Sequence, residues 1–186
     1  MTVKYVGNCQ PNIDCESLIA HLKTQEGHIH YGNISLPEDN PYYQDSLIQK
    51  QQAIDAGYRD PGNNSLEFRH YNGGEQFDFS IVEAFADLVK AKPLLCWISE
   101  IRPGKCAPWH WDINPWEKEH EKLGKLVRYH CHLSKPKPGH IFIVEDQVFY
   151  NQEQGSIYQW SDLHAYHAGS NVGLETKFLF TFTGYQ

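Results

Sequence analysis

Paired cysteine motifs are missing from this sequence of 186 residues. Its five cysteines are odd in number and widely separated, and no Cys-x-x-Cys pair occurs among them. A disulfide framework normally shows an even number of cysteines in a short secreted chain. The pattern therefore predicts free thiols in a reducing compartment.

Long apolar runs are missing as well. No stretch approaches the roughly 20 apolar residues that a membrane-spanning helix needs. The first eight residues also lack the apolar core of a signal peptide. Together with the free thiols, these absences predict a soluble protein of the cytoplasm that has no membrane partner.

Clustered basic charge is the third absence. The chain has 16 lysines and arginines against 23 acidic residues, a formal net charge of -7, and no basic run beyond the scattered lysines of residues 135–137. A nucleic-acid backbone attracts a concentrated basic surface, so nucleic acid is not expected as the principal partner. With 40% hydrophobic and 13% aromatic residues, the composition is that of one globular domain with a substantial core.

The order of the predicted elements indicates the fold class. Helical spacing predicts helices over 13–23, 45–56 and 80–91, the first capped by Asn12 or Asp14 and the last by a capping box of Ser80 and Glu83. A charged surface segment over 114–125 could cover a site. After it, turn signals separate a series of short strands: 126–133, 141–145, 147–150, 156–160, 164–168 and 177–183. Many short strands without intervening helices predict an antiparallel sandwich or barrel.

The most informative stretch spans residues 97–112, where a predicted strand and a Pro-Gly turn lead to His110 and Asp112. On an extended segment, side chains two residues apart point the same way, so an imidazole and a carboxylate would enter one pocket. A His-x-Asp triplet is a weak signal by itself among 11 histidines and 23 acidic residues. One more histidine would complete the two-histidine, one-carboxylate set that leaves open positions on Fe(II).

Two other polar stretches bear on this site. His164 and His167 lie three residues apart, so on one strand they face opposite ways and only one can join His110 and Asp112. Arg128, His130 and His132 alternate along a predicted strand and share one face. That face either lines a polar pocket inside a barrel or meets water at an edge.

The ordered set of these motifs is more specific than any one of them. Arg102-Pro103-Gly104, His110-x-Asp112, residues 155–160, His167-x-x-x-Asn171 and Lys177 together resemble the Fe(II)- and 2-oxoglutarate-dependent oxygenases, most closely the aspartyl/asparaginyl β-hydroxylase group. The resemblance covers residues 94–184. It implies a mainly β protein with flanking helices, built on a double-stranded β-helix of the jelly-roll, cupin-like kind. The whole chain, 1–186, would be one oxygenase domain, with a supporting part over 1–93 and the jelly-roll core over 94–186.

The resemblance also implies roles for individual residues. His110, Asp112 and His167 match the metal ligands, and Lys177 stands where the family usually has an arginine for the distal carboxylate of 2-oxoglutarate. His132 matches a histidine that helps to bind this cosubstrate, while Arg128 and His130 would face the cosubstrate or substrate. Fe(II), 2-oxoglutarate and O2 would then hydroxylate a C–H bond, with release of succinate and CO2. The substrate would be an aspartyl or asparaginyl residue of a peptide, or a small polar metabolite.

Two departures and two alternatives accompany this interpretation. Members of the β-hydroxylase group can lack the carboxylate ligand that Asp112 supplies, and a carboxylate on iron favours hydroxylation over halogenation. Lysine at 177 provides a point charge where arginine provides a bidentate fork. The same donors also suit a Zn(II) hydrolase or isomerase in a cupin-like barrel. A non-catalytic barrel that binds a ligand is the other alternative. The sequence does not indicate an oligomeric state.

Overall fold

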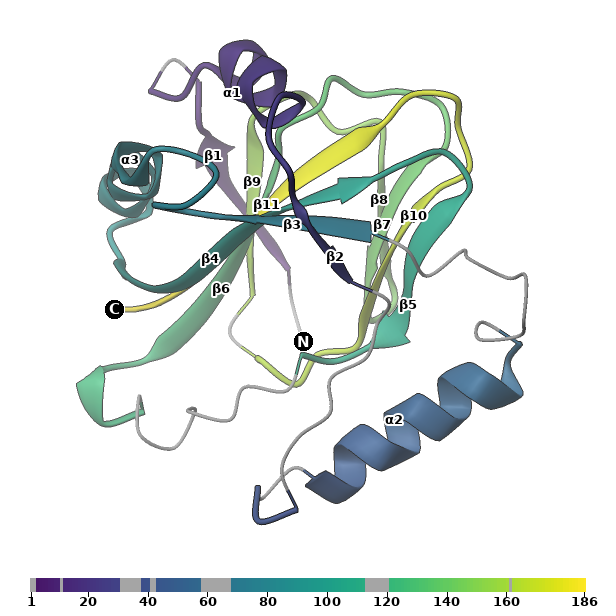
Figure 1. The fold of residues 1–186 in the computed structure, drawn as a ribbon. Coiled ribbons are helices and arrows are strands. Elements are labelled where there is room, and N and C mark those ends of the chain that lie inside the picture. Colours follow the sequence, from purple (N-terminus) through teal and green to yellow (C-terminus); the bar gives the residue numbers. More distant parts are fainter. Residues whose placement is uncertain are drawn as a thin grey trace.

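Eleven strands form two antiparallel sheets in the computed structural model, which describes residues 3–10, 12–30, 38–40, 43–57, 68–112, 121–160 and 162–186 (Figure 1). The larger sheet has, in spatial order, β1 (Lys4–Asn8), β9 (Ser156–Trp160), β6 (Leu126–His132), β11 (Lys177–Tyr185), β4 (Lys92–Ile101), β3 (Phe68–Asn72) and β2 (His28–His30). The smaller sheet has β5 (Lys105–His110), β10 (His167–Asn171), β7 (His140–Val144) and β8 (Gln147–Tyr150).

Two of the described helices, α1 (Cys15–Leu22) and α3 (Phe79–Val89), pack on the larger sheet. The other described helices are α2 (Tyr43–Asp55) and the short 3-10 helix η1 (Glu121–Leu123). Figure 1 shows α1 and α3 near the larger sheet, while α2 lies apart at the periphery. Buried side chains of α1 and α3 share one hydrophobic core with strands of the larger sheet. The three predicted helices are therefore confirmed, with small shifts of their ends.

The capping of these helices differs in one respect from the prediction. Asp14 caps α1, and its carboxylate accepts hydrogen bonds from the backbone N–H groups of Glu16 and Ser17, both at 3.1 Å. The predicted capping box at the start of α3 is wrong. Its N-cap is Asp78, whose carboxylate accepts from the Ser80 backbone N–H at 2.8 Å. The helix begins one residue before Ser80, so that residue occupies the second helical position.

The two faces of β6 explain how the sheets come together. Its side chains at 127, 129 and 131 are buried in the core shared with α1 and α3. Those of Arg128, His130 and His132 are also buried, on the opposite face. The rings of His130 and His132 lie 4.4 Å and 6.2 Å from the ring of Phe142 on β7 of the smaller sheet. The polar face of β6 therefore lies between the sheets, which confirms the interior-pocket interpretation over the edge-strand one.

The sheet arrangement confirms the double-stranded β-helix. Two antiparallel sheets stack around an interior that contains a second hydrophobic cluster, including Phe142, Phe149 and Trp160.

All five cysteines are free, as predicted. None of the helices in the described part of the chain has both the length and the apolar character to span a membrane. Most of the predicted surface segment falls on residues 113–120, which lie outside the described residues.

One predicted strand is displaced along the sequence. The strand expected over 164–168 is β10, which begins at His167. The residues before it form a turn, in which the Asp162 carboxylate accepts a hydrogen bond from the His164 backbone N–H at 3.0 Å. The Ala165 backbone N–H donates to the Asp162 carbonyl at 3.2 Å. An aspartate that bonds to the backbone two residues on is a common turn device, and it holds His164 outside the sheet.

The close contact between two turns makes Gly139 a sensitive position. Gly139 has a φ of 91°, and a Cβ atom there would lie 2.1 Å from the backbone nitrogen of Gly173. Gly139→Ala should lower the free energy of unfolding by about 2 kcal/mol or more, because it combines an unfavourable φ with a backbone overlap. Gly74→Ala is the matched control: its φ is 83° but nothing lies within 4 Å of the added atom. Urea unfolding should show the smaller loss, about 1 kcal/mol, for the control. Equal losses would contradict the overlap.

Candidate metal centre

A tight turn positions β5, the strand that carries His110. Between β4 and β5, Gly104 has a φ of 75°, and the Lys105 backbone N–H donates to the Arg102 carbonyl at 3.0 Å. The turn returns the chain as β5, which pairs with β10 so that His110 stands opposite His167. Neighbouring antiparallel strands thus hold the two imidazole rings side by side, with centroids 4.5 Å apart.

Asp112 completes a cluster of three possible metal ligands. It follows the last residue of β5 by two positions, and its donor atom and those of His110 and His167 lie within 4.8 Å of one another. His110 Nε2 is 3.3 Å from Asp112 Oδ1, and His167 Nε2 is 3.4 Å from Asp112 Oδ2. The structure therefore brings together the three residues that the resemblance implied as metal ligands. Among the described residues, this is the one such group of histidine, cysteine or acidic side chains.

The backbone fixes which nitrogen of each histidine faces the centre. His110 Nδ1 lies 2.6 Å from the Pro108 carbonyl oxygen, and His167 Nδ1 lies 2.9 Å from the Ala165 carbonyl oxygen. A carbonyl oxygen can only accept, so each Nδ1 carries the hydrogen and donates it. Each neutral ring then presents the lone pair of Nε2 toward Asp112, which is the tautomer that a metal-binding histidine requires.

The donor set fits a divalent metal ion. Nitrogen and oxygen ligands lie about 2.1 Å from such an ion, so two of them are separated by about 3.0 Å at a right angle and by about 3.4 Å at the tetrahedral angle. The separations of 3.3 Å and 3.4 Å between Asp112 and the two Nε2 atoms fall within this range. Two imidazoles and one carboxylate suit Fe(II) with open coordination positions, and they also suit Zn(II).

Arg128 supports the carboxylate from inside the barrel. Its Nη1–H donates to Asp112 Oδ2 at 2.5 Å, and its Nε–H donates to Thr183 Oγ1 at 3.1 Å. The Arg128 side chain is 1% exposed and that of Asp112 is 22% exposed. Sequence reasoning placed Arg128 in the pocket but did not find these partners. The ion pair holds the carboxylate in place and engages the guanidinium that was predicted to face the cosubstrate or substrate.

The electrostatics of the cluster favour an ionised Asp112 carboxylate and a neutral His167, and they act in the opposite direction on His110. Burial opposes the negative charge of Asp112, but the Arg128 and His167 side chains outweigh it and hold the pKa of Asp112 well below its usual range. Burial lowers the pKa of His167. Burial also acts to lower the pKa of His110, but the hydrogen bond with Asp112 reverses the balance and the pKa is raised. Asp112 is therefore available as an anionic ligand at neutral pH.

Replacing Arg128 with methionine should destabilise the metal-free protein. The change leaves Asp112 as a partly buried carboxylate without its cation, so the free energy of unfolding should fall by about 3 kcal/mol. Added Zn(II) or Co(II) should recover part of the loss, because a bound cation stabilises the folded state. Thr183→Val is the control, since it removes only the neutral partner of Arg128 and should cost about 1 kcal/mol. The free energy of unfolding of both variants is measured by urea unfolding. If Arg128→Met loses no more than Thr183→Val, Arg128 does not support the Asp112 carboxylate.

The barrel interior next to the cluster contains polar atoms without partners. The ring of His130 lies 4.5 Å from that of Trp160 and 6.1 Å from that of His167. Within the described chain, His130 Nδ1, His132 Nε2 and Trp160 Nε1 are buried and make no hydrogen bond. Buried polar atoms normally have partners, so such a set is typical of a site that receives a polar ligand. Trp160 was not predicted as a site residue. It stands opposite Arg128 in the pairing of β9 with β6, and the alternation of residues along β9 could have indicated that it faces the same interior.

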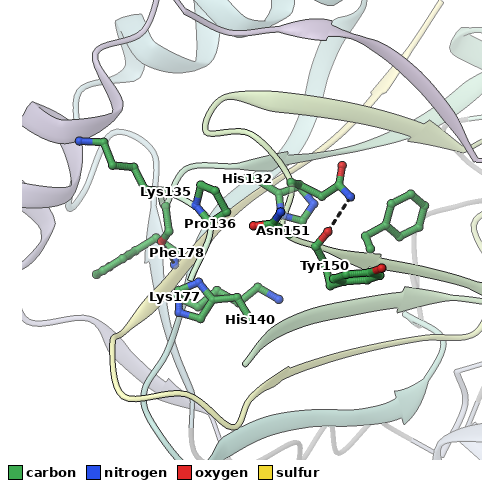
Figure 2. Close-up of a pocket in the computed structure, with 11 residues that line it drawn as sticks. His132, Lys135, Pro136, His140, Tyr150, Asn151, Lys177 and Phe178 are labelled. Carbon is green, nitrogen blue, oxygen red and sulfur yellow. Dashed lines mark hydrogen bonds between the residues drawn. The ribbon is translucent and has the colours of Figure 1, made fainter. Parts of the chain in front are cut away.

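Lys177 lies farther along the same interior, at the start of β11. It is 2% exposed, and burial lowers its pKa to about 7. Its Nζ donates to the Ile141 carbonyl at 2.6 Å. Figure 2 shows Lys177, His132 and His140 around one pocket. Burial and the neighbouring Lys177 lower the pKa of His132 to about 3, so this imidazole is neutral at pH 7.

His164 does not join the cluster. It is exposed, and its ring contacts that of Trp111 edge-on, with centroids 4.8 Å apart. The turn before β10 directs it away from the position that His167 occupies. Of the two histidines that the sequence left open, His167 is the one the structure places beside His110 and Asp112.

Comparison with known proteins finds likeness in structure alone. No family model and no curated protein matches this sequence. A viral collagen prolyl hydroxylase from Paramecium Bursaria Chlorella virus-1, solved as a 2OG complex, is similar over 100% of this chain and 97% of its own, with 12% identity and a TM-score of 0.48. A Pseudomonas putida prolyl-4-hydroxylase is similar over 93% of this chain and 100% of its own, with 12% identity and a TM-score of 0.41. A putative sugar phosphate isomerase from Acidithiobacillus ferrooxidans is similar over 67% of this chain and 63% of its own, with 15% identity and a TM-score of 0.40. Likeness at this level assigns no reaction or substrate to this chain.

Proposed function

We propose that this protein is an Fe(II)- and 2-oxoglutarate-dependent dioxygenase that hydroxylates a C–H bond of its substrate. The observation that carries the proposal is the convergence of His110 Nε2, His167 Nε2 and the Asp112 carboxylate within 4.8 Å, with both histidines locked in the metal-binding tautomer. When bound there, Fe(II) supplies the oxidising chemistry with 2-oxoglutarate and O2, and succinate and CO2 leave as products.

The residues around the cluster have distinct tasks in this proposal. His110, Asp112 and His167 hold the metal on one side and leave its other positions open. Arg128 balances the charge of Asp112 and keeps its carboxylate oriented. Phe142 and Trp160 are almost fully buried beside His167, and these rings exclude water from the interior.

The cosubstrate would extend from the metal into the barrel. The Lys177 ammonium group is the buried cation that would receive the distal carboxylate of 2-oxoglutarate. The unpartnered His132 Nε2 lies in the same pocket and would donate or accept a further hydrogen bond. His130 and Trp160, between this lysine and the cluster, would offer their unpartnered nitrogens to the middle of the ligand.

The substrate side of the proposal rests on the resemblance to the aspartyl/asparaginyl β-hydroxylases. We propose an aspartyl or asparaginyl residue of a peptide, or a small polar metabolite. Arg128 is already paired with Asp112, so it supports the site and is not the group that receives the substrate.

Metal-dependent binding of 2-oxoglutarate tests the proposal. Under anaerobic conditions, Fe(II)-loaded protein should bind 2-oxoglutarate at least about 100-fold more tightly than metal-free protein, because the ligand chelates the metal and also reaches Lys177. The readout is calorimetric titration. A protein that retains Zn(II) and shows no metal-dependent gain for 2-oxoglutarate would instead be the cupin-like hydrolase or isomerase. A protein that binds neither metal would be the non-catalytic barrel.

A further inference from the structure

The first residue of the hairpin turn between β7 and β8 has an unfavourable backbone conformation. Residues 145 and 146 alone join the two strands, and Val144 pairs with Gln147 across the turn. Glu145 has a φ of 50°, in the left-handed region, where such a turn normally has glycine, asparagine or aspartate. Residues held in this conformation against their preference cluster at functional sites, so the contacts of Glu145 indicate its task.

Glu145 binds both backbone polar groups of Tyr166, the residue before the candidate metal ligand His167. Its Oε1 atom accepts a hydrogen bond from the Tyr166 N–H at 2.7 Å, and its own backbone N–H donates to the Tyr166 carbonyl at 2.8 Å. Tyr166 lies outside β10, which begins at His167. The Glu145 carboxylate therefore takes the place of a strand partner for this N–H group, through a charge-assisted hydrogen bond.

The strand pairing leaves His167 at the end of its ladder. The register of β10 against β5 shifts between His167 and Gly169, and irregularities of this kind beside active sites re-aim side chains. On the other side, the pairing of β10 with β7 ends at His167 and Val144, and Glu145 is the next residue. Glu145 thus extends the contact between these strands by one residue, at the point where His167 needs a fixed backbone.

The segment before β10 contacts both histidines of the cluster. His167 Nδ1 donates to the Ala165 carbonyl at 2.9 Å, so the position of this segment determines the tautomer of the ring. The ring of Tyr166 stacks on that of Trp109, with centroids 5.8 Å apart and planes inclined by 19°. Trp109 directly precedes His110. Holding the Tyr166 backbone therefore also aligns β10 with β5 beside the metal cluster.

We propose that Glu145 is a positioning residue for the metal centre. Its carboxylate holds the Tyr166 backbone so that His167 directs Nε2 toward Asp112 in the metal-binding tautomer. Glu145 acts through Tyr166 and is not one of the three clustered ligands. The inference rests on the metal site of the proposed function, and it holds for Fe(II) and Zn(II) alike.

Glu145→Gly separates positioning from a merely structural role. Glycine suits the positive φ, so this variant should fold, but it lacks the carboxylate. It should bind Co(II) about 10-fold more weakly than wild type in calorimetric titration, as expected for loss of a group that orients a metal ligand. Glu145→Gln keeps an acceptor oxygen and should bind Co(II) within about threefold of wild type. Asp146→Gly is the matched control: it removes an exposed carboxylate from the same turn and should change affinity less than about twofold.

NMR of the His167 ring nitrogens in metal-free protein gives a readout that needs no metal. Wild type and Glu145→Gln should show the single Nδ1–H tautomer, and Glu145→Gly should show a mixture with the Nε2–H tautomer. Retention of wild-type Co(II) affinity or of the single tautomer in Glu145→Gly would overturn the positioning role, as would an equal loss in Asp146→Gly. If wild type itself binds no Co(II), the proposed metal site fails, and the tautomers still decide the role of Glu145.

Discussion

Replacing His167 with alanine should weaken the binding of Fe(II), or of Co(II) as its air-stable substitute, at least about 100-fold. The change removes one of three converging donors, and even the partners of metal ligands typically contribute 10- to 100-fold to affinity. His167 is 5% exposed and its Nε2 lies 3.4 Å from Asp112 Oδ2, so no water-exposed side chain can take its place without rearrangement. Calorimetric titration of the metal into apo protein measures the effect.

His164→Ala is the matched control for this experiment. Both variants remove one imidazole from the same short stretch, but the His164 ring is exposed and packs against Trp111. Metal affinity should therefore change less than about twofold. The opposite ranking, with affinity lost in His164→Ala and kept in His167→Ala, would show that the cluster does not form as described.

Lys177→Met should weaken the binding of 2-oxoglutarate to the metal-loaded protein by about 100-fold. The substitution removes the buried cation proposed for the distal carboxylate, while the chelating end of the ligand still reaches the metal. Metal affinity itself should change little, since Lys177 lies outside the cluster of His110, Asp112 and His167. Equal losses of metal and 2-oxoglutarate affinity would point to general unfolding of the barrel end.

The pH dependence of the affinity for 2-oxoglutarate tests the role of Lys177 independently. Burial lowers the pKa of Lys177 to about 7, and the groups that face it from neighbouring strands, His132 and His140, have lowered pKa values and are neutral at that pH. Below pH 7 the lysine is already protonated, so affinity should be nearly constant. Above pH 7 binding must take up a proton, and the dissociation constant should rise up to about 10-fold per pH unit. Lys177→Arg keeps its charge at all these pH values and should remove the dependence. A flat wild-type profile between pH 7 and 9 would contradict the role of Lys177.

Local patterns predicted much of the fold. Alternation along β6 and the turn signals between the later strands predicted an antiparallel β protein, which the two sheets confirm. The three helices followed from apolar spacing. What the patterns missed depends on single side-chain hydrogen bonds. The N-cap of α3 is Asp78, two residues before the predicted cap Ser80, and the hydrogen bond to Asp162 delays the start of β10 to His167. Competing caps of this kind differ by about 1 kcal/mol, too little for spacing alone to decide.

The site was predictable to the extent that it is local. His110 and Asp112 are two residues apart, so an extended segment suffices to direct both toward one pocket. The choice of His167 needed the pairing of β5 with β10, which is a tertiary contact. The ion pair between Arg128 and Asp112 likewise joins the larger sheet to the residues after β5, and the periodicity of neither segment predicts it.

Iron-dependent conversion of 2-oxoglutarate to succinate tests the central claim most directly. Wild type, Asp112→Ala and His164→Ala are each incubated with Fe(II) and 2-oxoglutarate under air, without added substrate, and succinate is measured. The proposed function predicts slow iron-dependent formation of succinate by wild type and His164→Ala, and at least about 100-fold less by Asp112→Ala. Succinate formation by Asp112→Ala at the wild-type rate, or none by the iron-loaded wild type, would contradict it.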